Sequence, residues 1–130
     1  MSTDPHRGIF ALCDEIRETS FAIHKYLRNE HREKIYENAL ANRLRKKGLD
    51  VKQQERMKVF DEDGTFLGLF KPDLLVDERL ICEIKGCSTL LDEHVAQLLG
   101  YLRSSHIEHG LLINFVGAKL QIRKYILSST

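Results

Sequence analysis

Apolar residues recur at helical spacing through the first third of the chain. The stripe consists of these positions: Ile9, Leu12, Cys13, Ile16, Ile23, Leu27, Ile35, Ala39, Leu40 and Leu44. No glycine or proline interrupts residues 9–47. Intervals of three and four residues place such positions on one face of a helix. We therefore predict a helical region over residues 5–47, starting at Asp4-Pro5 and ended by Gly48. It forms either one long helix or two helices with a break within residues 28–31.

After Gly48 the pattern becomes that of β-strands. Three strands are expected before the next helix, over residues 51–59, 66–76 and 80–85. The turn sequence at residues 61–64, Asp-Glu-Asp-Gly, joins the first two strands into a hairpin. Proline lacks an N–H for a strand ladder, so Pro72 predicts an edge or a bend just before Asp73.

The second half of the chain adds one helix and two strands. Asp92 is the expected cap of a helix over residues 93–104, and strands follow over residues 111–115 and 120–127. A strand, helix, strand connection implies parallel pairing, so parallel and antiparallel strands should share one sheet. The prediction is an α/β domain spanning residues 1–130, with elements in the order α, β-β-β, α, β-β. Its core region, residues 51–127, is a central mixed sheet flanked by helices.

Charge and composition narrow the function. Twenty basic residues against nineteen acidic residues give a net charge of +1, so affinity for nucleic acid would have to come from local patches. The three cysteines have no zinc-site spacing and are expected to be free thiols of a reducing compartment. No apolar run approaches the roughly 18 residues that a membrane span needs. The sequence therefore predicts a soluble, cytoplasmic protein with no membrane partner.

Three charged residues occur where the surrounding sequence is apolar. Glu83 and Lys85 are two residues apart on a predicted strand, so they point to the same face, and Asp73 lies at the end of the preceding strand. Buried charges are costly unless they pair or bind an ion. Two carboxylates and a backbone carbonyl suit Mg²⁺, which activates water and neutralises phosphate charge. The alternative is a solvated strand end with an incidental ion pair.

Two motifs resemble a known signature. The segments K-P-D-L-L-V and I-C-E-I-K resemble the two halves of the PD-(D/E)XK nuclease signature, whose family has a restriction-endonuclease-like core. Gln97 and Tyr101 match the Q-x-x-x-Y helix of the exonuclease branch of that superfamily. The resemblance implies that their amide and phenol lie at the active-site cleft, where they bind substrate or hold Lys85 in place.

A narrower resemblance covers about residues 21–126. The segments A-I-H-K-Y-L, E-K-I-Y-E and G-L-L-I-N-F are similar to those of the GxxExxY proteins, small bacterial and archaeal members of the same superfamily. Glu33 and Tyr36 match the family's Glu and Tyr, whereas Glu30 stands where its Gly belongs. The family's Gly-Pro-Gly helix break is replaced here by Arg28-Asn29-Glu30.

The helical region contributes further candidates. Glu37 shares a helix face with Glu33, and in this superfamily a first-helix acid often approaches the metal. We prefer Glu37 as the metal-facing acid and Glu33 as a structural partner, for example of a basic residue, although both could decorate a solvated face. His24 is a candidate for contact with phosphate or metal, or a structural histidine. Arg43 belongs to a basic run that could hold a phosphate backbone or simply face solvent.

These observations favour a metal-dependent nuclease that hydrolyses phosphodiester bonds. Asp73, Glu83, the Ile84 carbonyl and Glu37 would bind Mg²⁺, with Mn²⁺ as a substitute, and Lys85 would assist the attacking water. Expected site residues beyond these are Gln97 and Tyr101 in the cleft and, for substrate binding, His24, Glu33, Tyr36 and Arg43. DNA is the favoured partner, RNA stays open, and a homodimer is possible. The alternative is a non-catalytic nucleic-acid-binding or protein-binding module that retains the nuclease fold, but the complete Asp73, Glu83 and Lys85 set favours the enzyme.

Overall fold

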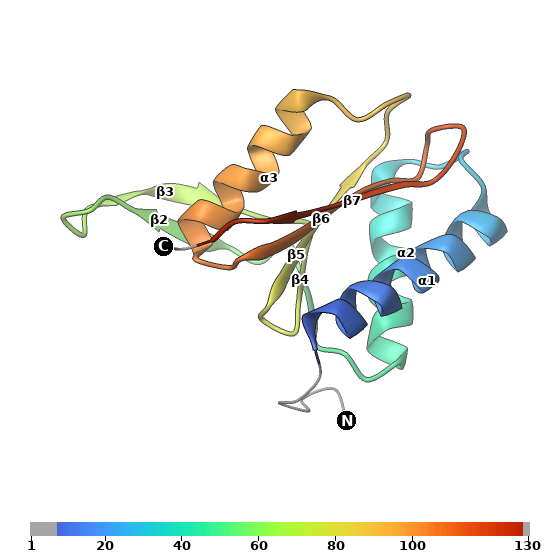
Figure 1. Cartoon of the computed structure of the whole chain (residues 1–130), viewed down its shortest axis with the longest axis horizontal. Helices are drawn as coiled ribbons and strands as arrows, with labels where there is room; N and C mark the ends of the chain where they lie inside the picture. The colour runs from blue at the N-terminus through green and yellow to red at the C-terminus, as the bar shows by residue number, and fades with distance from the viewer. Residues whose placement is uncertain (1–7, 129–130) are drawn as a thin grey trace.

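A five-stranded mixed sheet separates two layers of helices. The structure, a computed structural model of the whole chain, describes residues 8–128 (Figure 1). Its helices are α1 (Ile9–Leu27), α2 (Glu33–Lys46) and α3 (Asp92–Ser105). Its strands are β1 (Val51–Gln53), β2 (Met57–Phe60), β3 (Phe66–Phe70), β4 (Leu74–Val76), β5 (Leu80–Lys85), β6 (His109–Asn114) and β7 (Gln121–Ile126). The main sheet has the order β1-β4-β5-β6-β7, while β2 and β3 form a separate two-stranded sheet.

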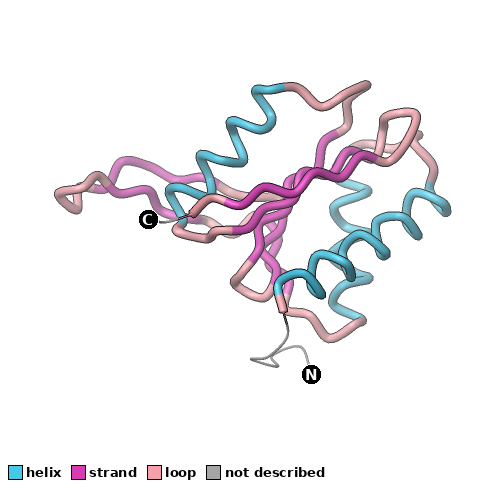
Figure 2. The backbone as a smooth tube through the Cα atoms, in the orientation of Figure 1, coloured by secondary structure: helices cyan, strands magenta, loops and turns pink. Residues whose placement is uncertain are grey.

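Alternation along the strands builds the two halves of the core. In β5, Cys82 and Ile84 point toward α1 and α2, whereas Ile81 points toward α3, where it packs with Leu98 and Leu102. The crossover through α3 makes β5 and β6 parallel, and the other neighbours in the main sheet are antiparallel. The backbone trace shows the same layering, with α3 on one side of the strands and α1 and α2 on the other (Figure 2). The predicted mixed α/β fold is confirmed.

The helical region consists of two helices, so the single long helix is wrong. Arg28 leaves the helical conformation with φ 62°, and its N–H donates to the His24 carbonyl at 2.9 Å. Beyond the break, α2 begins at Glu33. Gly48 takes φ 87° after α2, as expected of a glycine that ends a helix. The predicted start at Asp4-Pro5 lies outside the described residues.

Two of the predicted strands each divide into two. Residues 51–59 contain β1 and β2, which belong to different sheets, because Gln54 turns the chain with a left-handed φ of 55°. Residues 66–76 contain β3 and β4, and the chain bends between them at Pro72, where the proline was expected to interrupt a ladder. The predicted cap of α3 is also corrected. Leu91, not Asp92, is the N-cap residue, and its N–H donates to Nδ1 of His94 at 3.0 Å.

The β2–β3 hairpin projects beyond the main sheet, at the left of Figure 1. It is anchored where Phe70, the last residue of β3, stacks on Tyr101 of α3 with ring centroids 4.4 Å apart. Because Pro72 and Asp73 follow directly, this anchor also fixes where the chain re-enters the main sheet.

Among residues 8–128, no helix combines the length and the hydrophobicity needed to cross a membrane.

Candidate active site

Asp73, Glu83 and Lys85 meet at one end of the main sheet. Glu83 and Lys85 lie on β5 on the same side as Ile81, facing α3, and Asp73 immediately precedes β4. The Asp73 N–H donates to Oε2 of Glu83 at 2.7 Å, and the Ile84 N–H donates to Oδ2 of Asp73 at 2.7 Å. Each carboxylate is therefore held by the backbone of the other strand, as a rigid pair.

Glu37 joins this pair through a glutamine. The Glu37 side chain is buried on α2, with the residue 3% exposed. The Gln54 amide, Nε2, donates to Oε1 of Glu37 and to Oδ1 of Asp73, both at 3.0 Å. The second Glu37 oxygen accepts from Nζ of Lys34 at 3.0 Å and from Nε2 of Gln53 at 2.8 Å. Glu37 is thus buried and faces inward on α2, and its role at a metal stays a prediction.

The site carries more negative charge than its surroundings stabilise. Burial, followed by the charge of Asp73, raises the pKa of Glu83 to about 8. Burial also raises the pKa of Asp73, with Glu37 adding to the effect and Lys85 opposing it. Desolvated carboxylates at close range disfavour each other's ionised form. A divalent cation would relieve this repulsion.

The donor set fits a hard cation with few protein ligands. Mg²⁺ typically binds through one or two carboxylates and keeps several water molecules. In the described part of the chain, no group of three or more His, Cys, Asp and Glu side chains lies close enough to hold a metal ion. Asp73 and Glu83 would supply two side-chain ligands to such an ion, and the Gln54 amide lies between Glu37 and Asp73.

The Ile84 carbonyl would be a third ligand. The N–H and C=O of one strand residue point to the same side of the strand. The Ile84 N–H points toward Asp73, beyond the last paired residue of β4, Leu74. The Ile84 carbonyl accordingly points to the same side as the Asp73 carboxylate, where β4 no longer pairs with β5.

Residues of α3 form the opposite wall of the site. Nζ of Lys85 donates to Oε1 of Gln97 at 2.8 Å. Burial raises the pKa of Tyr101, and the charges of Glu83 and Asp73 add to the rise, so the phenol lies within electrostatic range of both. Gln97 thus contacts Lys85, and the roles of Gln97 and Tyr101 in the reaction stay predictions.

Glu33 supports the end of β5. Its Oε2 accepts from the Gly86 N–H at 2.9 Å. A Cβ at Gly86 would lie 2.9 Å from Cγ of Glu33, so a side chain at this position would collide with the carboxylate arm. Glu33 therefore ties the first turn of α2 to the residue after Lys85. Its partner is a backbone amide, not the basic residue that was suggested.

The structure does not bring Tyr36, His24 or Arg43 to the carboxylates. Tyr36 is fully buried, stacks on Phe115 at 4.6 Å, and donates its hydroxyl to the Arg28 carbonyl. A ring enclosed in this way cannot contact substrate, so the substrate-binding expectation for Tyr36 is corrected to a role in closing the helix break.

The other two lie on the helical layer. His24 on α1 has a buried Nε2 without a hydrogen-bond partner in the described chain. The Arg43 guanidinium lies 6.0 Å from the ring centroid of Tyr26. The roles of these two residues in substrate binding stay predictions.

Two site residues were missed by the sequence interpretation. Gln54 was expected within one continuous strand over residues 51–59, and the pattern of these residues does not signal the turn at Gln54. Asn114 is fully buried at the end of β6; its amide donates to the Cys87 carbonyl at 2.7 Å and its Oδ1 accepts from the Cys87 N–H at 3.3 Å. Asn114 fastens the loop after Lys85, and a lone amide within an apolar strand was its signal.

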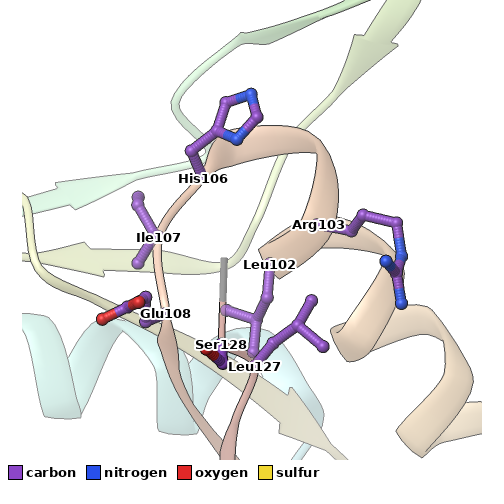
Figure 3. Close-up of a pocket in the computed structure, with 7 residues that line it drawn as sticks. All are labelled: Leu102, Arg103, His106, Ile107, Glu108, Leu127 and Ser128. Carbon is purple, nitrogen blue, oxygen red and sulfur yellow. The ribbon is translucent and has the colours of Figure 1, made fainter. Parts of the chain in front are cut away.

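The pocket drawn in Figure 3 belongs to another part of the molecule. It measures about 180 Å³ and is lined by Leu102, Arg103, His106, Ile107, Glu108, Leu127 and Ser128. These residues gather where α3 ends and β6 begins, whereas Lys85 and Gln97 lie where β5 ends and α3 begins. None of the predicted site residues lines this pocket.

The layered sheet and the acid–lysine group at the end of β5 together define a domain of the restriction-endonuclease-like class. A family model of the PD-(D/E)XK nuclease superfamily matches residues 11–125, and the chain belongs to this superfamily. No curated protein and no solved structure matches the chain. The narrower likeness to the GxxExxY proteins stays a prediction.

Proposed function

We propose that the protein is a metal-dependent nuclease that hydrolyses phosphodiester bonds, with DNA as the favoured substrate. The observation that carries the proposal is the intact group of Asp73, Glu83 and Lys85 at one strand end, with both carboxylates held by backbone amides. A chain that had lost catalysis would have no need to keep two buried, mutually repelling carboxylates beside a lysine.

The site residues divide into those that would bind the metal and those that would act on the attacking water and the phosphate. Asp73, Glu83 and the Ile84 carbonyl would hold Mg²⁺ or Mn²⁺. Glu37, which shares the Gln54 amide donor with Asp73, would add negative charge near the ion. When bound, the ion supplies charge neutralisation on the phosphate and lowers the pKa of a water molecule. Lys85 orients the attacking water or stabilises the negative charge that develops on the phosphate. Gln97 limits the positions that the Lys85 ammonium can take.

Cleavage should depend on a divalent ion. Labelled linear, nicked and branched DNA, together with RNA of the same sequences, is incubated with the protein and Mg²⁺ or Mn²⁺. We expect cleavage of at least one DNA substrate, its loss with EDTA, and its return when Mg²⁺ exceeds the chelator. Faster cleavage of RNA would correct the substrate. No cleavage of any substrate by folded protein would favour the non-catalytic binding module instead.

Gln54→Ala is expected to lower the cleavage rate about 10- to 100-fold, the usual effect of losing a group that orients metal ligands. The variant frees both Glu37 and Asp73 from their shared donor, so more Mg²⁺ should be needed for half-maximal rate. Initial rates measured across a Mg²⁺ titration test this. Gln53→Ala is the matched control, because Gln53 contacts Glu37 and Asn38 but not Asp73. An equal loss in the control would show that bridging to Asp73 is not the cause.

A further inference from the structure

The β2–β3 hairpin presents an apolar surface that the rest of the described chain leaves uncovered. Ten large hydrophobic side chains are exposed in the described residues, and four of them lie on this hairpin: Phe60, Phe66, Leu67 and Leu69. Their exposed fractions run from 49% to 60%. A two-stranded hairpin is at best marginally stable alone, and only one side of this one packs against α3. The uncovered side is suited to a partner.

One edge of the hairpin is open to strand pairing. On β2, Lys58 and a register shift between Val59 and Phe60 disfavour pairing with another strand. On β3, the five residues Phe66–Phe70 contain no charge and no proline. No backbone hydrogen bond joins the outer edge of β3 to another part of the described chain. An exposed apolar edge of this kind pairs readily with a second strand.

Charges at the two ends of the hairpin are complementary. The turn carries Asp61, Glu62 and Asp63. The base of the hairpin, the end opposite the turn, carries Arg56, Lys58 and Lys71. All six side chains are exposed. Within the described chain none of the six forms an ion pair. If two hairpins align antiparallel, the acidic turn of each lies beside the basic base of the other.

We propose that the hairpin is a homodimerisation surface, in which β3 of one copy pairs antiparallel with β3 of a second copy about a two-fold axis. The pairing would make one four-stranded sheet in which Leu67 and Leu69 of both copies become cross-strand neighbours on one face. A two-fold arrangement needs a self-complementary surface, which an apolar strand with opposite charges at its ends provides. Nucleic acid is the less favourable occupant, because residues 56–71 hold three acidic and three basic side chains and so carry no net positive charge.

The inference does not depend on cleavage, and its test measures mass. Light scattering and sedimentation across a concentration series should give twice the monomer mass for the full chain. Leu69→Glu should weaken dimerisation at least about tenfold, because it removes an apolar cross-strand contact and places two like charges close to the two-fold axis. Phe21→Glu is the matched control: Phe21 is 58% exposed on α1, away from the hairpin, so this variant should stay dimeric. Circular dichroism checks that both variants fold.

Charge exchange tests the antiparallel alignment itself. One variant converts Asp61, Glu62 and Asp63 to Lys, and a second converts Arg56, Lys58 and Lys71 to Glu. Each variant alone should be monomeric, and an equimolar mixture should form a heterodimer. A monomeric wild-type chain at high concentration would overturn the proposal. So would a Leu69→Glu variant that keeps the wild-type mass but loses DNA binding, which would assign the hairpin to nucleic acid.

Discussion

Glu83→Gln and Lys85→Met are each expected to reduce cleavage by about 100- to 1,000-fold. Glu83→Gln removes one of two side-chain charges that would hold the metal, and Lys85→Met removes the cation beside the reacting phosphate. Groups placed where charge develops in the transition state commonly contribute about 100- to 1,000-fold each. Single-turnover cleavage with saturating Mg²⁺ measures both variants against the wild type.

Both substitutions are chosen to leave the fold intact. The amide oxygen of Gln at position 83 can still accept from the Asp73 N–H, which the carboxylate accepts at 2.7 Å. Methionine keeps the aliphatic stem of Lys85 and removes the ammonium that donates to Gln97. Lys46→Met, on the exposed last turn of α2, is the matched control and should keep full activity. Full activity in Lys85→Met with loss in Glu83→Gln would show that the metal acts without the lysine.

The convergence of Asp73, Glu83 and Lys85 could be predicted because strand geometry is local. Two residues separated by one position on a strand share a face whatever the rest of the fold does. The carboxylate at Asp73 then needed only one adjacent strand to reach them, and the short turn at residues 77–79 provides it. Neither spacing nor the family match ranks Glu37 above Glu33, since spacing places both on the same helix face and the family's Glu matches Glu33.

Gln54 could not be predicted, because its position depends on a backbone conformation that the side chains do not encode. A non-glycine residue with φ 55° is uncommon and costs conformational energy, so nothing in the pattern of residues 51–59 signals it. This one turn ends β1 in the main sheet and sends the chain into the β2–β3 hairpin. The same turn places the Gln54 amide between two carboxylates.

Tyr36 is a residue that the family match identified but whose role it did not predict. It was matched to a family position and expected at the substrate, but its hydroxyl closes the break between α1 and α2, where it contacts Arg28 and His31. A motif identifies which residue is needed, not whether it is needed for chemistry or for packing. Here the ring supports the helix layer from which Glu37 reaches the site.

The metal-free protein should lose stability as the pH rises from about 4.5 to about 8. The pKa of Glu83 is raised from 4.5 to about 8 in the folded chain, mainly by burial, so the folded state binds a proton that the unfolded state releases over this interval. Stability falls with rising pH wherever the unfolded state binds fewer protons. Each unit of pKa difference corresponds to about 1.4 kcal/mol of stability. Because the titration is shared between the coupled carboxylates Glu83 and Asp73, the free energy of unfolding should fall by about 3 kcal/mol.

Glu83→Gln separates the effect of the Glu83 proton from titrations outside the site. The amide mimics the protonated carboxyl, so in EDTA the variant should match the wild type near pH 5 and exceed its free energy of unfolding by about 3 kcal/mol near pH 8. Burial lowers the pKa of His109, which costs stability as the pH falls, but this contribution is common to both proteins and cancels. Urea denaturation at the two pH values measures the difference. Adding Mg²⁺ at pH 8 should stabilise the wild type much more than the variant, because the ion replaces the proton that Glu83 has lost. A difference between the two proteins that stays constant with pH would show that Glu83 is ionised in the metal-free fold.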